Sequence, residues 1–437
     1  MRLTVLGTGY LGATHAACMA ELGHEVLGVD IDPSKIAKLQ SGDVPFYEPG
    51  LPEVLERNIK AGRLSFSDSY AEAAEFAEVH FLAVGTPQRK GELAADLQYV
   101  DSVIESLVPL AKKPILIIGK STVPVGTATR LREHAQLLSD RTVEIAWNPE
   151  FLREGHAVED TLRPDRIVVG YEEDAKLDVQ KIVRDIYHSA IGLGTPFVLT
   201  DLATAELVKA AANAFLATKI SFINAIAEVC EAAGADVTQL ADAIGYDERI
   251  GRKFLNAGIG FGGGCLPKDI RAFMARSGEL GAGDVLTLLR EVDNINMRAR
   301  SRMVELARQV CEGSFVGYSV AILGTAFKPN SDDVRDSPAL NIAGQIHLQG
   351  ATVTIYDPKA MANSQRSFPT LSYATSVLDA CSGADLVMVL TEWDEFKEIV
   401  PSDLGRVVRR KRIIDGRNCL DREHWIDADW QIHGVGK

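Results

Sequence analysis

The sequence predicts an α/β protein made of two Rossmann-like, doubly wound domains that are joined by a long central helix. Three observations support this prediction. Apolar strands alternate with helical patterns near the N-terminus, residues 201–233 contain no Gly or Pro, and the N-terminal strand-and-turn pattern returns after residue 318. Alternating strands and helices are typical of a parallel sheet covered on both faces. At 437 residues we expect three segments: a cofactor-binding domain (1–200), a helical domain (201–310) and a second Rossmann-like domain (311–437).

The first strand leads into a glycine-rich turn. In "LTVLGTGYLG", Gly7, Gly9 and Gly12 fit G-x-G-x-x-G at the start of an Ala-rich helix, and Asp30 ends the next strand. Strand, helix and acid at this spacing indicate a dinucleotide site, in which Gly9 allows the backbone to approach the pyrophosphate. The acidic Asp32 favours NAD over NADP, while Lys35 slightly weakens that preference. The alternative is an ordinary tight turn between strand and helix.

Three further strands are predicted at "VHFLAV", "PILIIGKST" and "VEIAWNP". Thr86 and Thr122 follow two of these strands at their carboxyl ends. Because ligands of open α/β sheets bind at that edge, both threonines are candidates for ligand contacts.

The stretch 201–233 reads as one helix that is long enough to bridge two domains. Glu206, Lys209 and Asn213 are spaced three and then four residues apart, so they share one helix face. Lysine there could stabilise an oxyanion, and Asn could hold a water or hydroxyl. A solvated Glu–Lys face is the commoner origin of such a triplet.

The last third of the chain repeats the N-terminal pattern. The repeated positions are Gly23, Val26 and Asp30 in the first copy and Gly350, Val353 and Asp357 in the second. The second turn has Ala326 where the first has Gly9, so the close pyrophosphate approach is lost. We expect a different phosphate ligand there, held by a side chain such as Lys328, although a surface lysine would look the same.

The segment "GIGFGGGCLPKD" places five glycines just before Cys265. Glycine allows close backbone approach, and Lys268 and backbone amides could favour a thiolate. Asp269 lies within one helical turn and could position a proton acceptor. A cysteine nucleophile beside a nicotinamide cofactor can add to an aldehyde and pass through a thioester. A structural cysteine in a tight turn is the alternative.

The stretch "NPEFLREG" follows the strand "VEIAW" and places Glu150 and Glu154 four residues apart. Two carboxylates at this spacing could serve as a general base and as a hydrogen-bond acceptor for a sugar or the nicotinamide ribose. A capped helix start would give the same pattern.

The net charge of −14 argues against nucleic acid or an anionic membrane as a partner. A local cluster of Arg249, Arg252 and Lys253 nevertheless precedes the glycine loop. In so acidic a chain, this cluster is a candidate phosphate site.

Six cysteines lie far apart, at positions 18, 230, 265, 311, 381 and 419, without metal-ligand spacing. We expect free thiols, five of them buried as small hydrophobes, and no metal. The N-terminus enters the first strand without a signal-peptide pattern, and no run of eighteen uncharged apolar residues occurs, so a cytoplasmic location is expected.

Together these motifs resemble the nucleotide-sugar dehydrogenases of the UDP-glucose/GDP-mannose dehydrogenase family. The motifs are the dinucleotide turn, "STVPVGT", "NPEFLREG", "ELVKAAANAF", "RIGRKFLNAGIGFGGGCLPKD" and "GTAFKPNSDDVRDSP". The resemblance covers almost the whole chain. It implies dimerisation through the central helix and two successive NAD-dependent oxidations of a sugar C6 alcohol, with UDP-glucose as the expected substrate.

The resemblance also implies residue roles. Cys265 matches the nucleophile that holds the aldehyde and then the thioester, and Lys209 matches a lysine that stabilises oxyanions. Asp269, Thr122 and Asn213 match the set that organises water and proton transfer. Glu150 matches a candidate base for thioester hydrolysis; which of Glu150, Lys209 and Asp269 accepts each proton stays open.

Binding residues carry over in the same way. Matches to cofactor contacts are Gly7, Gly9, Tyr10, Leu11, Gly12, Asp30, Lys35, Thr86, Thr122, Glu154, Lys268 and Arg335. Matches to substrate contacts are Glu150, Phe151, Leu152, Lys209, Asn213, Phe254, Leu255, Asn256, Gly258, Gly262, Lys328 and Arg417, with Arg249 reaching a neighbouring subunit.

The chain departs from relatives at Gly264, where Ser or Tyr is frequent, and in the loop "PQRKGELAADL". Both departures bear on sugar preference. The alternatives are the same chemistry on GDP-mannose or a UDP-N-acetylhexosamine and, from another class, a non-catalytic NAD-binding regulatory protein.

Overall fold

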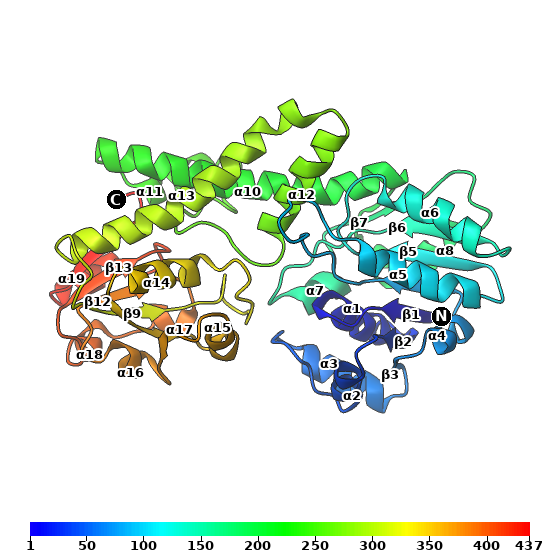
Figure 1. Ribbon diagram of the computed structural model, residues 1–437, viewed down its shortest axis with the longest axis horizontal. Coiled ribbons are helices and arrows are strands. Elements are labelled where there is room, and N and C mark those ends of the chain that lie inside the picture. The colour runs from blue at the N-terminus through cyan, green and yellow to red at the C-terminus, as the bar shows by residue number, and fades with distance from the viewer. The chain divides into compact units, whose positions relative to one another are not determined.

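The computed structural model describes residues 1–437 and every side chain except that of residue 285. It contains two compact units. The N-terminal unit comprises Met1–Ala212 with Arg271–Gly281, and the C-terminal unit comprises Asn213–Ile270 with Ala282–Lys437. Each unit contains one sheet with helices on both faces (Figure 1). Residues of the predicted helical segment 201–310 belong to both units.

The sheet of the N-terminal unit has the strand order β3-β2-β1-β4-β5-β6-β7-β8. Its strands are β1 (Arg2–Leu6), β2 (Glu25–Val29), β3 (Leu64–Ser67), β4 (Val79–Leu82), β5 (Ile115–Gly119), β6 (Val143–Trp147), β7 (Ile167–Gly170) and β8 (Phe197–Thr200). All neighbouring pairs are parallel except β6 and β7. The first six strands have the order of a dinucleotide-binding fold, which confirms the predicted doubly wound sheet.

Helices cover both faces of this sheet. They are α1 (Tyr10–Glu21), α2 (Pro33–Gln40), α3 (Leu51–Lys60), α4 (Tyr70–Phe76), α5 (Gln98–Leu107), η1 (Val108–Leu110), α6 (Thr127–Leu138), α7 (Ala157–Leu162), α8 (Val179–Ile186) and α9 (His188–Gly192). Successive strand residues face opposite sides. Val5 therefore joins the core that contains Ala16 of α1, and Leu6 joins the core that contains Ile104 of α5. Full burial of such a side chain contributes about 1.5–3 kcal/mol.

The C-terminal unit contains a parallel sheet in the order β11-β10-β9-β12-β13-β14. Its strands are β9 (Ser319–Leu323), β10 (Thr352–Tyr356), β11 (Ser372–Tyr373), β12 (Leu386–Val389), β13 (Arg412–Asp415) and β14 (Gln431–Gly434). Its helices are α11 (Val237–Gly245), η2 (Gly283–Leu286), α13 (Thr287–Val310), α14 (Pro338–Leu348), α15 (Met361–Ser367), α16 (Val377–Cys381), α17 (Asp394–Lys397), α18 (Pro401–Leu404) and α19 (Arg422–Asp427). The predicted second Rossmann-like domain is confirmed, with the same strand order as the first.

The two copies share their turn geometry but not the surroundings of the acid after the second strand. Asp30 accepts a hydrogen bond from the backbone of Thr8, and Asp357 accepts one from the backbone of Thr325. Asp357 also accepts a bond from the indole of Trp393 and is only 1% exposed. It therefore serves the fold, whereas Asp30 lines a cavity.

The predicted long helix is confirmed as α10 (Leu202–Ala233), which spans about 48 Å. A second helix, α12 (Leu266–Glu279), also has residues in both units. Among the described residues, α10 is the one helix whose length and composition would permit a membrane crossing. Its buried Ser221 donates a hydrogen bond to α13, and its buried Glu206 accepts backbone bonds, as expected of a core helix.

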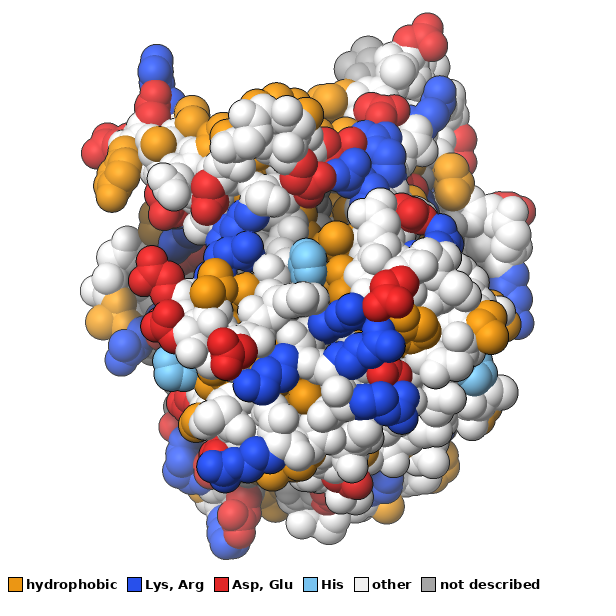
Figure 2. Space-filling view, turned by 90° about the vertical axis from the view of Figure 1, so that its left-hand side faces the viewer, with side chains coloured by type: hydrophobic (Ala, Val, Ile, Leu, Met, Phe, Trp, Pro, Cys, Tyr) orange, Lys and Arg blue, Asp and Glu red, His pale blue; other side chains and the backbone are white. Residues whose placement is uncertain are grey.

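All six cysteines are free thiols, as predicted. Cys265 is exposed, Cys419 is half-buried and the other four are buried. On the face viewed in Figure 2, Lys and Arg side chains are interspersed with Asp and Glu.

Candidate active site

The dinucleotide turn follows β1. Gly7 has φ +90°, and a Cβ on Gly12 would lie 1.8 Å from the carbonyl oxygen of Gly7, so only glycine fits there. A Cβ on Gly9 would meet no protein atom within 4 Å, which leaves space beside the turn. No described side chain caps the N-terminus of α1, so its first amides can donate to a phosphate. The turn therefore fits a pyrophosphate.

Asp30 ends β2 beside this turn. Its carboxylate accepts hydrogen bonds from the backbone of Thr8 at 2.8 Å, the backbone of Asp32 at 3.1 Å and Nζ of Lys35 at 2.7 Å. Burial alone would raise the pKa of Asp30, but these hydrogen bonds outweigh it and lower the pKa below its usual value. An ionised acceptor at this position suits ribose hydroxyls.

A cavity of about 310 Å³ extends from the turn. Gly7, Gly9, Asp30 and Lys35 line it, as the sequence predicted for a cofactor site. Tyr70, Tyr99 and Ser102 also line it; they come from α4 and α5 and belong to no glycine motif, so sequence reasoning missed them.

The N-terminal unit also brings together two residues that were predicted separately, Lys209 and Glu150. Nζ of Lys209 lies 3.0 Å from Oε1 of Glu150, and both side chains are largely buried. The backbone amide of Leu152 donates to the other Glu150 oxygen at 2.7 Å, which fixes the carboxylate. The Lys209 ammonium lies 5.7 Å from the centre of the Phe151 ring. A fixed cation beside a carboxylate can stabilise an oxyanion and accept or relay a proton.

Thr86 and Thr122 meet at the sheet edge, as predicted. The Thr86 hydroxyl donates to the backbone oxygen of Thr122 at 2.7 Å, so two loops that follow neighbouring strands are joined. This bond holds both threonines at the carboxyl ends of β4 and β5.

Lys120 was not predicted as a site residue. It directly follows β5, is 8% exposed and donates to Oδ1 of Asn148 at 3.2 Å. It lines a small cavity with Glu150. Burial lowers the pKa of Lys120 to about 8, with Glu150 acting in the opposite direction and Lys209 in the same one. A lysine at the end of the apolar strand "PILIIGK" was the available signal.

Glu48 is a second residue that the sequence did not reveal. Its buried carboxylate accepts the amides of Gly155 at 2.6 Å and Ala157 at 2.7 Å, and also the hydroxyl of Tyr10. Tyr10 lies in the dinucleotide turn, and Glu154 precedes Gly155. Glu48 therefore joins the dinucleotide turn, which carries Tyr10, to the loop that carries Glu154, and both are predicted cofactor contacts.

Cys265 lies in the C-terminal unit at the N-terminus of α12, and its carbonyl accepts the amide of Asp269 at 2.9 Å. Asp269 is 4% exposed and is held by Lys268 at 2.6 Å and by Nδ2 of Asn213 at 2.7 Å. The helix N-terminus favours an anion, so the thiolate form of an exposed cysteine is stabilised there. Lys268, Asp269 and Asn213 are thus joined by side-chain contacts at the start of the helix that follows Cys265. Thr122, which the resemblance groups with Asp269 and Asn213, belongs to the N-terminal unit.

The remaining predicted contacts include two exposed arginines and a lysine beside an aromatic ring. Arg249 is exposed and paired with Asp247, and Arg335 is exposed and paired with Asp333. Lys328 lies over the Phe327 ring, 5.4 Å from its centre.

Arg417 is mostly buried, and its guanidinium donates to the carbonyls of Leu390, Gly260 and Phe327. In the loop before Cys265, Phe254 and Asn256 are exposed, whereas Leu255 packs into a small core. A ligand contact from position 255 is therefore restricted to its backbone. Gly258 and Gly262 are buried.

The two Rossmann-type sheets, the dinucleotide turn and an exposed thiol at a helix N-terminus define an NAD-dependent dehydrogenase with a cysteine nucleophile. Family models match the NAD binding domain over residues 1–191, the central domain over 203–298 and the UDP binding domain over 321–422. The chain belongs to the UDP-glucose/GDP-mannose dehydrogenase family.

Similar proteins match along the whole chain. UDP-glucose 6-dehydrogenase TuaD of Bacillus subtilis is 40% identical, covering 100% of this chain and 93% of its own. UDP-glucose 6-dehydrogenase of Rhizobium meliloti is 38% identical, covering 100% of both. The solved UDP-glucose dehydrogenase of Pyrobaculum islandicum superposes with a TM-score of 0.91 at 36% identity, covering 100% of this chain and 97% of that one.

Proposed function

We propose that this protein oxidises UDP-glucose at C6 to UDP-glucuronate, with NAD as the electron acceptor. The full-length identity of 37–40% to proteins that are named UDP-glucose 6-dehydrogenases carries the proposal. A solved UDP-D-ManNAc dehydrogenase from Pyrococcus horikoshii is 27% identical, with a TM-score of 0.86, and a GDP-mannose dehydrogenase from Pseudomonas aeruginosa is 26% identical, with a TM-score of 0.54. UDP-glucose is therefore favoured over these sugars.

The overall reaction converts UDP-glucose, two NAD⁺ and one water into UDP-glucuronate, two NADH and three protons. When bound, NAD supplies the two-electron acceptor for each oxidation. In this proposal Lys209 stabilises the alkoxide at C6 before the first oxidation. The Cys265 thiolate then bonds to C6 of the aldehyde and gives a thiohemiacetal, which becomes a thioester in the second oxidation.

Thioester hydrolysis completes the reaction. A water attacks the thioester carbon, the C6–S bond breaks and the Cys265 thiolate is released. Glu150 is held as an ionisable acceptor by the amide of Leu152 and by Lys209, which suits a base for this water. In this proposal Asp269 and Asn213 hold the water or hydroxyl beside Cys265, and their mutual hydrogen bond supports a shared role.

The test is the NADH released per sugar consumed, measured with excess NAD on UDP-glucose, UDP-N-acetylhexosamines and GDP-mannose in parallel. Two NADH per UDP-glucose, with the other sugars slow, would support the proposal. The same ratio with another sugar alone would keep the mechanism and replace the substrate. No turnover with any of them would favour a non-catalytic NAD-binding protein, and C265S would then change nothing.

We further propose a cytoplasmic homodimer that pairs through α10. Phe215, Phe222 and Val229 are 66%, 49% and 60% exposed, and their seven-residue spacing places them on one face of the helix. Such a face in water is costly and suits a second copy. Light scattering should give twice the chain mass, and F222E should reduce it to one. Cell fractionation tests the location.

A further inference from the structure

The glycine loop before Cys265 is held from several sides. Apart from Arg417, neither the sequence nor the proposed chemistry assigns the side chains that hold it to the site. Asn296 of α13 forms hydrogen bonds with both backbone groups of Phe261. Its Oδ1 accepts the amide at 2.7 Å, and its Nδ2 donates to the carbonyl at 3.0 Å. Asn296 is 0% exposed. A buried side chain that satisfies both groups of one residue acts like a strand partner.

Arg300, one turn further along α13, joins the same carbonyl to the Rossmann-like fold of the C-terminal unit. Its Nη2 donates to the Phe261 oxygen at 3.1 Å, and its Nη1 lies 2.8 Å from Oδ1 of Asp336. Arg300 is 2% exposed. A buried cation needs such partners, so the arginine, the loop and Asp336 hold one another in place.

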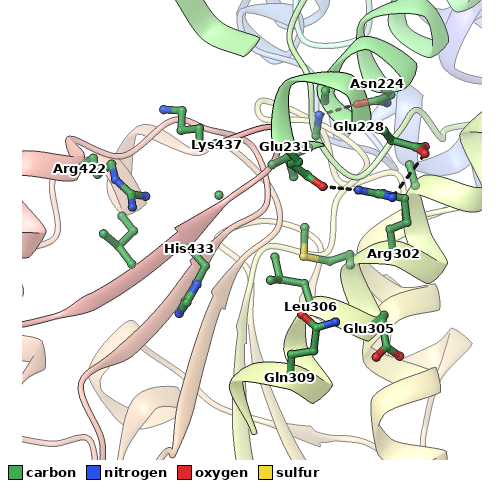
Figure 3. Close-up of a pocket in the computed structure, with 17 residues that line it drawn as sticks. Asn224, Glu228, Glu231, Arg302, Glu305, Leu306, Gln309, Arg422, His433 and Lys437 are labelled. Carbon is green, nitrogen blue, oxygen red and sulfur yellow. Dashed lines mark hydrogen bonds and ion pairs between the residues drawn. The ribbon is translucent and has the colours of Figure 1, made fainter. Parts of the chain in front are cut away.

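The start of the loop is held from α10. Oδ1 of Asn224 accepts the amide of Gly258 at 2.8 Å, as Figure 3 shows. Asn224 is 5% exposed and borders a cavity of about 360 Å³ that lies between α10, α13 and β14. Arg417 holds the next part of the loop through the carbonyl of Gly260 at 3.0 Å.

Glycine packing leaves the loop little freedom. A Cβ on Gly260 would lie 2.4 Å from Oδ1 of Asn296, and one on Gly262 would lie 2.4 Å from the oxygen of Asp336. The amide of Gly263 donates to the carbonyl of Arg335 at 2.9 Å. Contacts this close fix the backbone up to Gly263, two residues before Cys265.

We propose that Asn296, together with Asn224 and Arg300, is a positioning residue that sets where the loop presents the Cys265 thiolate. This inference rests on the proposed function, because it concerns the nucleophile of that reaction. A reacting group displaced by about 1 Å can lose a factor of about 100 in rate. Loss of the two hydrogen bonds between Asn296 and Phe261 should therefore reduce turnover, while UDP binding is largely retained.

The experiment compares N296A, N296D, N224A and N224D with the control S221A. The buried Ser221 hydroxyl donates to the carbonyl of Val292 at 2.8 Å, so S221A removes a buried bond between the same two helices without touching the loop. Each variant is measured for unfolding midpoint, kcat, KM for UDP-glucose and the rate of Cys265 alkylation by iodoacetamide without substrate.

N296A should lower kcat about 10- to 100-fold, change KM less than about threefold and slow alkylation at pH 7. Aspartate can accept the amide of Phe261 but cannot donate to its carbonyl, so N296D should not rescue the loss. Asn224 uses only its acceptor oxygen towards the loop, so N224D should recover much of what N224A loses.

Equal kcat and alkylation rates in N296A, N224A and S221A would overturn the proposal. If N296A does not fold, the comparison of N224A with N224D and S221A gives the same decision. The alkylation rate needs no sugar. Slow alkylation in N296A alongside a wild type that oxidises no nucleotide sugar would therefore support the positioning role while refuting the proposed function.

Discussion

Replacing Glu206 by Gln should remove a pH-dependent loss of stability from the N-terminal unit. Glu206 lies on α10, is 2% exposed and accepts the amides of Gly126 and Ala128, each at 2.7 Å, at the N-terminus of α6. Burial raises the pKa of Glu206 to about 7, although these hydrogen bonds and the charge of Arg276 act in the opposite direction.

The sign of the effect follows from this raised pKa. The unfolded chain loses the proton near pH 4.5 and the folded chain near pH 7, so the protonated carboxyl stabilises the fold fully below pH 4.5. This stability is lost as the pH rises through 7. A difference of roughly 2.5 pKa units corresponds to about 3 kcal/mol, of which about 2.5 kcal/mol disappears between pH 5 and pH 8.

The assay is urea unfolding followed by circular dichroism at pH 5, 6, 7 and 8. Gln is neutral at every pH, so E206Q should lack this pH dependence. Its Nε2 cannot accept the second backbone amide, so E206Q should be less stable than the wild type at pH 5, and that deficit should shrink by about 2.5 kcal/mol by pH 8. E133Q, which removes an exposed charge from α6, is the control. A wild-type minus E206Q difference that stays constant from pH 5 to pH 8 would refute the reasoning.

Three further outcomes are expected. C265S should abolish the complete four-electron oxidation while leaving NAD binding by calorimetry unchanged, because the thiol lies outside the dinucleotide turn; retained formation of the acid would contradict the nucleophile. G12A should eliminate detectable NAD binding or folding, since its Cβ would lie 1.8 Å from the Gly7 oxygen. A G12A protein that binds NAD as tightly as the wild type would show that the turn tolerates a side chain. D30A should weaken NAD binding by about 1.5–3 kcal/mol, the range for hydrogen bonds to a charged group, and an unchanged dissociation constant would separate Asp30 from the ribose.

Much of the fold could be predicted because its signals are local. The glycine turn, the apolar strands and the helix without Gly or Pro each depend on a few neighbouring residues, and the structure places them as expected. β7 and β8 were not predicted. They are four-residue strands, and no residue of β8 is fully buried, so neither shows a strong periodic pattern.

The residues that support the site were harder to predict, because their partners are distant in sequence. Glu48 accepts hydrogen bonds from the amides of residues 155 and 157, and Asn296 forms hydrogen bonds with Phe261, which lies 35 positions earlier. Neither residue stands in a pattern whose spacing indicates this contact. Lys209 and Cys265 could be predicted because the resemblance named them. Their spacing alone was also compatible with a solvated helix face for Lys209 and a structural role for Cys265.

The two Rossmann-like halves share a fold, but the C-terminal half could not readily be redesigned to bind NAD. Introducing glycine at Ala326 would not restore a dinucleotide turn, because Pro329 stands where the first copy has Gly12, and it would not create a second NAD pocket. The acid that would have to face a ribose, Asp357, is covered by Trp393 and already bonded to the backbone of Thr325. An engineer would have to remove the indole and supply another partner for this carboxylate, at a cost to the stability of the whole C-terminal sheet. Two domains that share a fold are therefore not interchangeable in ligand binding.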